Sequence, residues 1–279
     1  MFRRFLILVC FLPMAHSVYA FEFMTGHGNG LGQSLLLSHS TPSMLLSAPT
    51  GGLDNGEWRI ESGISRLYDL SDLDQAFLAS AFRWRGLIAA AGVSQFGNRD
   101  LYAERIAKLA LSYRYRHFVL GGSGSIMSTS FGGGYAPLNT TTFGLGAAAS
   151  FKRVYASFSA DNLNSPRLDP SSPVIRPIYS LYGEFWSTKS LSTLIRSTFE
   201  KTEKPQFAVG QRIGVSELSS LLWGLQTAPI QFGGGVELGI KSSRISYCVS
   251  YHPVLGMSHT IAVSYGSKTA TTGATDAFK

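Results

Sequence analysis

The feature that most constrains this chain is a period of two in its apolar residues toward the C-terminal end. From Gln231 to Gly266 apolar side chains recur at every second position, and Gly, Ser, Ala and charged residues fill the positions between them. Side chains alternate between the two faces of a β-strand, so the pattern predicts strands with one apolar face. Two architectures fit: a soluble β-sandwich or solenoid, in which that face is the core, and a membrane β-barrel, in which it contacts lipid.

The first twenty residues indicate a secretory signal peptide. Arg3 and Arg4 precede an apolar run that begins at Phe5, and small residues lie at a plausible cleavage site that ends at Ala20. The alternative is a membrane anchor, but the run is shorter than the ~20 residues that a membrane-spanning helix needs. We therefore expect residues 1–20 to be removed and the protein to be exported.

Composition narrows the choice between the two architectures. The formal net charge is +7, and the loss of Arg3 and Arg4 leaves 22 basic against 17 acidic residues, a charge of +5. The basic residues are spread along the sequence without a dense run, which disfavours a nucleic-acid partner. Cys10 leaves with the signal peptide, and Cys248 then has no intramolecular partner. No later apolar run reaches the length of a membrane-spanning helix, so such a chain spans a membrane only as a closed barrel.

The spacing of strands and connections favours the barrel. Most of the expected strands approach the ~9–11 residues that a tilted membrane-spanning strand needs, and their connections alternate between short and long. Bacterial barrels show this alternation, with short periplasmic turns and longer external loops. We therefore predict an all-β fold, an antiparallel transmembrane β-barrel of about 14 strands in the bacterial outer membrane. The expected strands are residues 57–67, 75–84, 87–96, 104–115, 118–128, 141–151, 154–161, 178–187, 191–200, 206–215, 219–226, 230–241, 244–252 and 258–265.

The alternation also assigns individual side chains to the two faces. Val236 and Leu238 are predicted to face lipid, and Gly235 and Glu237 to face the lumen. A charge on the lipid face near the middle of the bilayer costs ~2–4 kcal/mol. We therefore expect Leu238→Arg to be costly and Gly235→Ser to be milder.

The lumen face carries charges of both signs, which are tolerable in a wet or paired interior and costly against lipid. We expect these residues to form a network that braces the interior, because a ring of one sign would be typical of ion selection instead. The residues on this face are Arg59, Glu61, Arg83, Lys108, Arg114, Glu184, Arg196, Glu200, Arg212, Glu237 and Arg244.

The segment before the first strand shows no strand period. Residues 21–56 are rich in Leu, Ser and Gly. The expected lumen face of the barrel carries many small residues, which leave space for this segment. Apolar side chains are costly to leave in water, so we expect this segment to act as a plug in the lumen. The alternative is a flexible periplasmic leader. The predicted domains are the signal peptide (1–20), this plug (21–56), the barrel (57–266) and a polar C-terminal tail (267–279). The expected plug side chains are Leu35, Leu36, Leu37, Leu45 and Leu46.

Three stretches resemble the PorV/PorQ group of bacterial outer-membrane proteins, which is related in fold to the FadL transporters of hydrophobic compounds. The closing hairpin "YHPVLGMSHTIAVSYG" is similar to the family's last external loop. The stretch "FSADNLNSP" resembles the family's "NLG", with Asn164 in place of Gly. Residues 30–53 look like the family's N-terminal segment, with Ser47, Ala48 and Pro49 in place of Asn-Pro-Ala. The loop residues that carry the first similarity are His252, Pro253, Leu255, Gly256 and His259.

The resemblance implies an accessory or docking component of an outer-membrane secretion assembly of the type IX kind, with secretion-system proteins as partners. The alternative that it leaves open is a FadL-like channel, with a small hydrophobic compound as the ligand. In both cases the barrel is surrounded by outer-membrane lipid, and no cofactor is implied.

The sequence contains no convincing catalytic or metal-binding site. Ser250 and His252 share the lumen face two positions apart, but no nearby acid would orient the histidine. No group of Cys and His has the spacing of a metal site. We therefore expect a protein that is not an enzyme, with no catalytic or metal-binding residues.

Overall fold

A computed structural model describes residues 23–38, 40–54, 56–98, 100–133 and 135–267. The predicted signal peptide and residues 268–279 of the predicted tail lie outside these residues. The boundary at Ala20 therefore remains a prediction, and so do the other predicted domain boundaries.

The described residues form fourteen strands in one closed barrel in which every strand pairs antiparallel with its neighbours in sequence, and β1 pairs with β14. This confirms the predicted fold class. The strands are β1 (Trp58–Arg66), β2 (Asp74–Trp84), β3 (Leu87–Asn98), β4 (Tyr102–Tyr115), β5 (Phe118–Phe131), β6 (Leu138–Phe151), β7 (Val154–Asp161), β8 (Ile178–Thr188), β9 (Leu191–Glu200), β10 (Gln206–Gly214), β11 (Ser219–Thr227), β12 (Ile230–Ile240), β13 (Ser243–His252) and β14 (Gly256–Gly266).

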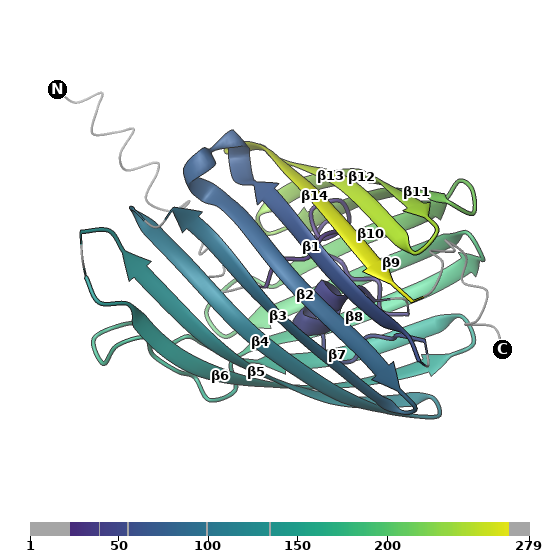
Figure 1. Ribbon diagram of the computed structural model, residues 1–279, viewed down its shortest axis with the longest axis horizontal. Helices are drawn as coiled ribbons and strands as arrows, with labels where there is room; N and C mark the ends of the chain where they lie inside the picture. The colour runs from purple at the N-terminus through teal and green to yellow at the C-terminus, as the bar shows by residue number, and fades with distance from the viewer. Residues whose placement is uncertain (1–22, 39, 55, 99, 134, 268–279) are drawn as a thin grey trace.

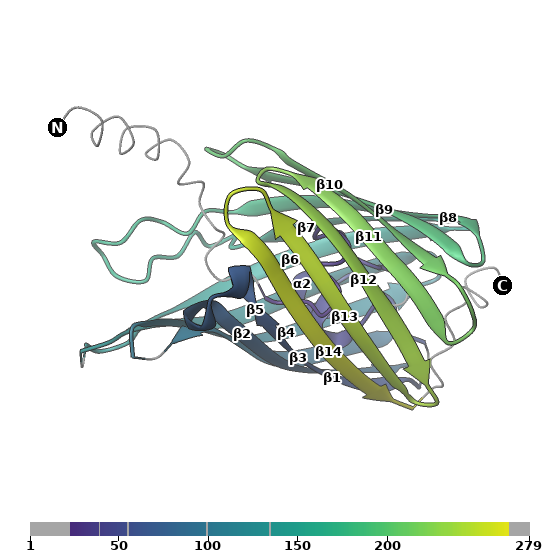
Figure 2. The same ribbon diagram turned by 90° about the horizontal axis from the view of Figure 1, so that it is seen from above.

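The three longest strands are neighbours, and each extends further than the sequence pattern predicted. β4, β5 and β6 have 14 residues each, and the added residues lie at the end of the barrel that carries the longer connections. There the residues of β5 and β6 are mostly Ser and Thr without apolar alternation, but the backbone pairing continues as far as Tyr102 opposite Phe131 and Thr129 opposite Leu138. The period-two signal therefore ends before the ladder of hydrogen bonds does. This part of the wall extends beyond its neighbours in Figures 1 and 2.

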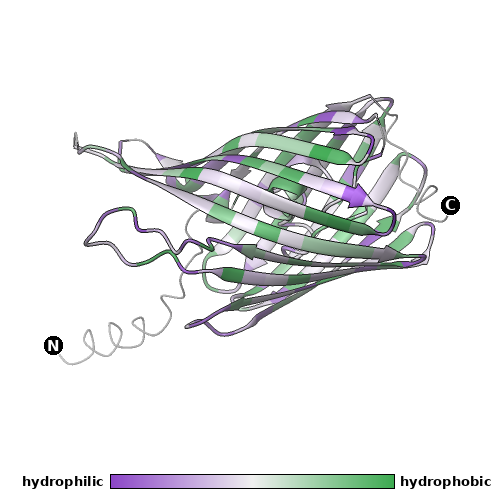
Figure 3. Cartoon of the chain, turned by 90° about the horizontal axis from the view of Figure 1, so that it is seen from below, coloured by the Kyte–Doolittle hydropathy of each residue, from purple (hydrophilic) through white to green (hydrophobic). Residues whose placement is uncertain are grey.

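The outer face of the barrel is apolar, as the alternation predicted. In β13 the exposed side chains include Ile245, Tyr247 and Tyr251, and the buried side chains between them include Arg244 and Cys248. Apolar residues recur along the strands around the wall, whereas hydrophilic residues gather toward the two ends (Figure 3). An apolar belt around a closed barrel is the outer surface expected of a protein surrounded by lipid.

The connections at the two ends differ in length. At one end five of them are two-residue turns, and the sixth is residues 215–218. At the other end lie η2 (Leu67–Asp69), η3 (Ser71–Leu73) and the longest connection, residues 162–177. We call these two ends the short-turn end and the long-loop end. Among the described residues, no helix is long and apolar enough to cross a membrane.

Candidate functional site in the barrel lumen

The N-terminal segment lies inside the barrel. Most of the described residues between 23 and 54 are buried, and they include the short helix α2 (Pro42–Ser47). The strands of the wall surround this helix in Figures 1 and 2. The residues predicted to plug the lumen are all among the buried residues, with at most 5% of the surface of each exposed: Leu35, Leu36, Leu37, Leu45 and Leu46.

Glycines of the wall allow the backbone of this segment to lie directly against the strands. A Cβ atom added to Gly210 would lie 2.7 Å from the carbonyl oxygen of Leu31. A Cβ atom on Gly224 would overlap the backbone of Leu31, and one on Gly233 would overlap that of Asn29. The small residues of the lumen face therefore leave the space that the N-terminal segment occupies.

Three buried glutamates hold the segment at three points around the lumen. Glu61 lies on β1, Glu184 on β8 and Glu237 on β12, and each has at most 1% of its surface exposed. A buried carboxylate is costly unless charges or hydrogen bonds compensate for the lost water. In all three cases part of that compensation comes from the N-terminal segment.

Glu237 is the centre of the largest group of charges in the described lumen. Its Oε2 lies 2.7 Å from Nε2 of His27 and 3.6 Å from Nη1 of Arg244. Its Oε1 accepts a hydrogen bond from Nη2 of Arg212 at 2.6 Å. The two arginines belong to the wall and the histidine to the N-terminal segment, so this carboxylate joins the two parts of the structure.

Glu184 accepts three hydrogen bonds from the N-terminal segment. Its Oε2 accepts from the backbone amides of Leu37 and Ser38, both at 2.8 Å, and its Oε1 accepts from the hydroxyl of Ser38 at 2.9 Å. At the third point, Oε2 of Glu61 accepts from the amide of Ser43 in α2 at 2.9 Å. The amides that these carboxylates satisfy lie in irregular backbone or in the first turn of a helix, where no backbone partner is provided.

The other predicted lumen residues form separate contacts. Arg59 pairs with Glu57, and Lys108 Nζ lies 3.0 Å from Oδ1 of Asp161. Arg114 donates to the hydroxyl of Tyr155 at 3.2 Å, Arg196 donates to the carbonyl of Gln33 at 3.2 Å, and Arg83 donates to the carbonyl of Leu53. Glu200 lies at the end of β9. The charges thus lie in several groups around the segment, and their partners His27, Glu57 and Asp161 had no distinguishing sequence signal.

The residues that resemble the family's last external loop lie mainly on strands. His252 ends β13, Gly256 begins β14, and His259 lies within β14. Pro253 and Leu255 lie in the connection between these strands. His252 Nδ1 accepts from the amides of Val254 and Leu255 at 3.2 and 3.1 Å, a role in shaping the turn. Nδ1 of His259 lies 2.8 Å from the hydroxyl of Tyr247, on the outward face.

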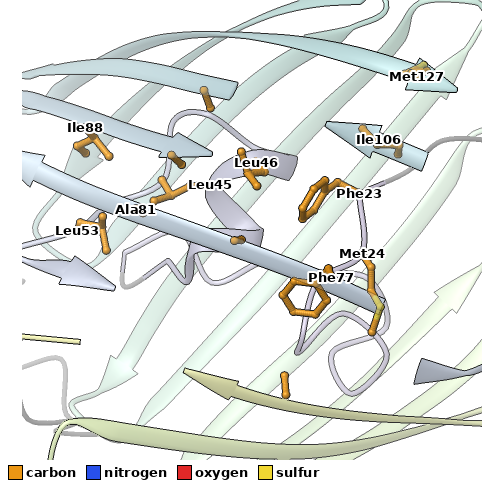
Figure 4. Close-up of a cluster of buried hydrophobic side chains, with 14 residues drawn as sticks. Phe23, Met24, Leu45, Leu46, Leu53, Phe77, Ala81, Ile88, Ile106 and Met127 are labelled. Atoms are coloured by element: carbon orange, nitrogen blue, oxygen red, sulfur yellow. The ribbon is translucent and has the colours of Figure 1, made fainter. Parts of the chain in front are cut away.

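Two apolar clusters fill much of the lumen. The first joins Phe23, Met24, Leu45 and Leu46 to side chains of the wall, and Figure 4 shows most of its members. The wall side chains in this cluster are Phe77, Ala79, Ala81, Ile88, Ala90, Ile106, Ala110, Met127 and Ala262. The second cluster joins Leu31, Leu35, Leu36, Leu37 and Met44 to other wall residues, among them Tyr182, Trp186 and Leu194. The N-terminal segment contributes to both.

The longest connection closes the first cluster from the long-loop end. Leu168 and Ile175 belong to residues 162–177, and both pack against the cluster while staying partly exposed. Lys108 projects to the lumen between Ile106 and Ala110 of the same strand. The cluster is thus the part of the apolar lumen that lies under the longest connection. Within the described parts of the chain, no group of three or more His, Cys, Asp or Glu side chains is placed to hold a metal ion.

Comparisons with known proteins agree with this architecture. No protein-family model matches the sequence, and no curated protein matches it. Among solved structures, a FadL homologue from Pseudomonas aeruginosa matches with a TM-score of 0.62 and 12% identity over 90% of this chain and 100% of that chain. The toluene transporter TodX from P. putida matches with a TM-score of 0.62 and 9% identity over 90% of this chain and 99% of that one.

A TodX variant described as a monoaromatic hydrocarbon channel matches with a TM-score of 0.65 and 10% identity over 89% of this chain and 99% of that one. At such low identity these matches show the fold alone. The chain therefore has the fold of the FadL-type transporters, a closed antiparallel barrel of the kind found in bacterial outer-membrane proteins.

Proposed function

We propose that this protein is an outer-membrane channel for small hydrophobic compounds, in which the N-terminal segment closes the lumen to water. The observation that carries the proposal is the apolar cluster around Phe23, Phe77 and Met127 under residues 162–177. The lumen of a water-filled porin is polar. A lumen lined by apolar side chains favours ligands of the same character.

The position of the cluster suits a first binding step. Leu168 and Ile175 are partly exposed, so an apolar compound that arrives from the long-loop end meets them before it meets the buried side chains. The N-terminal segment, which contributes to the cluster, is held in the lumen by Glu61, Glu184 and Glu237. This arrangement favours passage of a ligand through local rearrangement and disfavours an open aqueous pore.

The structural matches support the same class of substrate. One is described as a toluene transporter and another as a monoaromatic hydrocarbon channel. The role in a secretion assembly rests on the sequence resemblance, and none of the three matched structures described above is named as a secretion component. The channel is therefore the better-supported function.

The proposal is tested by equilibrium binding of radiolabelled toluene to the folded protein in detergent micelles. Replacement of Leu168 and Ile175 together by Glu should weaken binding by about tenfold or more, because a carboxylate against an apolar ligand costs more than ~1.4 kcal/mol. Leu163→Glu is the matched control, since Leu163 lies in the same connection with 39% of its surface exposed and is not among the residues of the cluster.

Both variants must keep a folded band that migrates differently before and after boiling. Absence of toluene binding by the unaltered protein would refute the proposed substrate class. An equal loss of binding in the control variant would refute the assignment of the site to this cluster.

A further inference from the structure

The short-turn end of the barrel collects positive charge. Its six connections hold six basic residues and a single acidic residue, Glu217, whereas the seven connections at the long-loop end hold five residues of each sign. We call the six basic residues the short-turn rim. They come from five different hairpins, so they are distributed around the circumference of the barrel. The rim consists of Arg85, Arg116, Lys152, Arg153, Lys189 and Lys241.

The rim lies where the apolar outer face ends. All six residues are exposed. The guanidinium of Arg85 lies over the ring of Trp84 at 4.9 Å, and that of Arg116 lies over the ring of Tyr115 at 5.4 Å. Both aromatic rings are exposed on the outward side of the wall, with 58% and 59% of their surfaces accessible. Aromatic residues at this position mark the boundary between hydrocarbon and headgroups in membrane barrels.

Five of the six rim residues form no ion pair with another described residue. None of the ion pairs between described residues involves Arg85, Arg116, Lys152, Lys189 or Lys241. The two arginine contacts with aromatic rings leave the N–H groups at the edges of the guanidinium planes available to acceptors. An anion that approaches the rim therefore meets five cations that no carboxylate of the described residues holds.

The backbone conformation supplies a second, independent observation. Four rim residues have a positive φ: Arg85 at 55°, Arg116 at 54°, Lys152 at 37° and Lys241 at 53°. Two-residue hairpin turns of this kind favour Asn, Asp or Gly, which adopt the left-handed region more easily. Basic side chains occur here against the preference of the turn. A residue retained in a strained conformation points to a function for its side chain.

We infer that the short-turn rim binds the phosphate groups of anionic phospholipids in the leaflet that borders it. Short turns face the periplasm in bacterial barrels, so the bordering leaflet is made of phospholipid. The rim is continuous with the lipid-facing aromatic residues and is spread around the barrel. This distribution fits a belt of lipid headgroups better than the single contiguous patch that an acidic protein would need. The inference does not depend on the compound that the lumen carries.

The test measures lipid selectivity by quenching of tryptophan fluorescence in vesicles. The full-length mature protein is reconstituted in phosphatidylcholine with increasing fractions of brominated phosphatidylglycerol or brominated phosphatidylcholine, and the ratio of the two association constants is measured. For the unaltered protein at low salt we expect a preference for phosphatidylglycerol of about fivefold, the effect of roughly one favourable contact per headgroup. The preference should fall toward one at 0.5 M salt, which screens exposed charges.

The decisive variant replaces Arg85, Arg116, Lys152 and Lys241 by Asn and Lys189 by Gln. Asn suits the left-handed turn positions, so the hairpins should fold while the charge is lost. This variant should show a ratio near one. A matched control removes five cations near the long-loop end by exchange to Gln and should keep the preference. The control positions are Arg105, Arg167, Arg176, Lys201 and Lys204.

A ratio near one for the unaltered protein would overturn the inference. So would an equal loss of preference in the control variant. If the rim variant loses its heat-modifiable band, two other tests replace it: the single variant Lys241→Asn and the salt titration of the unaltered protein. If neither lowers the preference for phosphatidylglycerol, the inference is overturned as well.

Discussion

Glu184 on β8 and Ser38 of the N-terminal segment form two hydrogen bonds, in which the carboxylate accepts from the amide at 2.8 Å and from the hydroxyl at 2.9 Å. The two residues are 146 positions apart in the sequence. The same carboxylate also accepts from the amide of Leu37. A single wall residue thus orders a stretch of irregular backbone inside the barrel, and this gives a direct test of how firmly the lumen is closed.

Replacement of Glu184 by Ala should loosen the N-terminal segment. The change leaves the buried amide of Leu37 and the partly buried amide and hydroxyl of Ser38 without their acceptor, and we expect it to lower the free energy of unfolding by about 2–4 kcal/mol. Planar-bilayer recordings should show more frequent conducting events than for the unaltered protein. Glu200→Ala is the control, because Glu200 lies at the end of β9, and it should cost less than about 1 kcal/mol. Equal stability of the two variants would contradict the role assigned to Glu184.

Replacement of Gly224 by Val should displace the segment while keeping the barrel. A side chain at this position overlaps the backbone of Leu31, so we expect a loss of about 1–3 kcal/mol from overpacking and a rise in conductance. The matched control is Gly234→Val on the adjacent strand β12. An added Cβ at Gly234 meets no described atom closer than 3.9 Å, and its side chain faces lipid. If conductance rises equally in both variants, the lumen contact is not its cause.

Exchange of Val236 for Arg should destabilise the barrel more than exchange of Leu238 for Arg. Val236 lies nearer the middle of β12, whereas Leu238 lies two residues from its end, and both are exposed on the outer face. We expect about 2–4 kcal/mol for Val236→Arg and about 0–1 kcal/mol for Leu238→Arg, measured by unfolding in lipid vesicles. From the sequence alone, Leu238→Arg was expected to cost ~2–4 kcal/mol. A greater loss at Leu238 than at Val236 would place the middle of the bilayer nearer the short-turn end.

One expectation about the lumen face needs revision for a physical reason. Gly235→Ser was expected to be mild because the position faces inward. In the structure an added Cβ would lie 2.7 Å from Sγ of Cys248 and 2.8 Å from the carbonyl oxygen of Tyr247. Alternation identifies the face on which a residue lies, but the space available there depends on the neighbouring strand, which the pattern does not show.

The sequence by itself determined the strands, because a strand that is apolar on one face carries its own signature every second residue, and the alternation of short and long connections favoured a barrel. The faces of Val236, Glu237 and Leu238 followed from the same local pattern. The burial of Leu35, Leu36 and Leu37 followed from their apolar character, because their segment shows no strand period. The predicted strand ends were wrong where apolar residues do not alternate, as at the Ser- and Thr-rich ends of β5 and β6.

Only the tertiary structure decided which distant residues meet. His27 lies 210 positions from Glu237, and nothing in the local sequence of either residue marks it as a partner of the other. The same holds for the short-turn rim, whose basic residues look scattered along the chain and gather because hairpins of similar length place every second connection at the same end. Local patterns record the environment of one residue, whereas partnerships depend on the closure of the barrel.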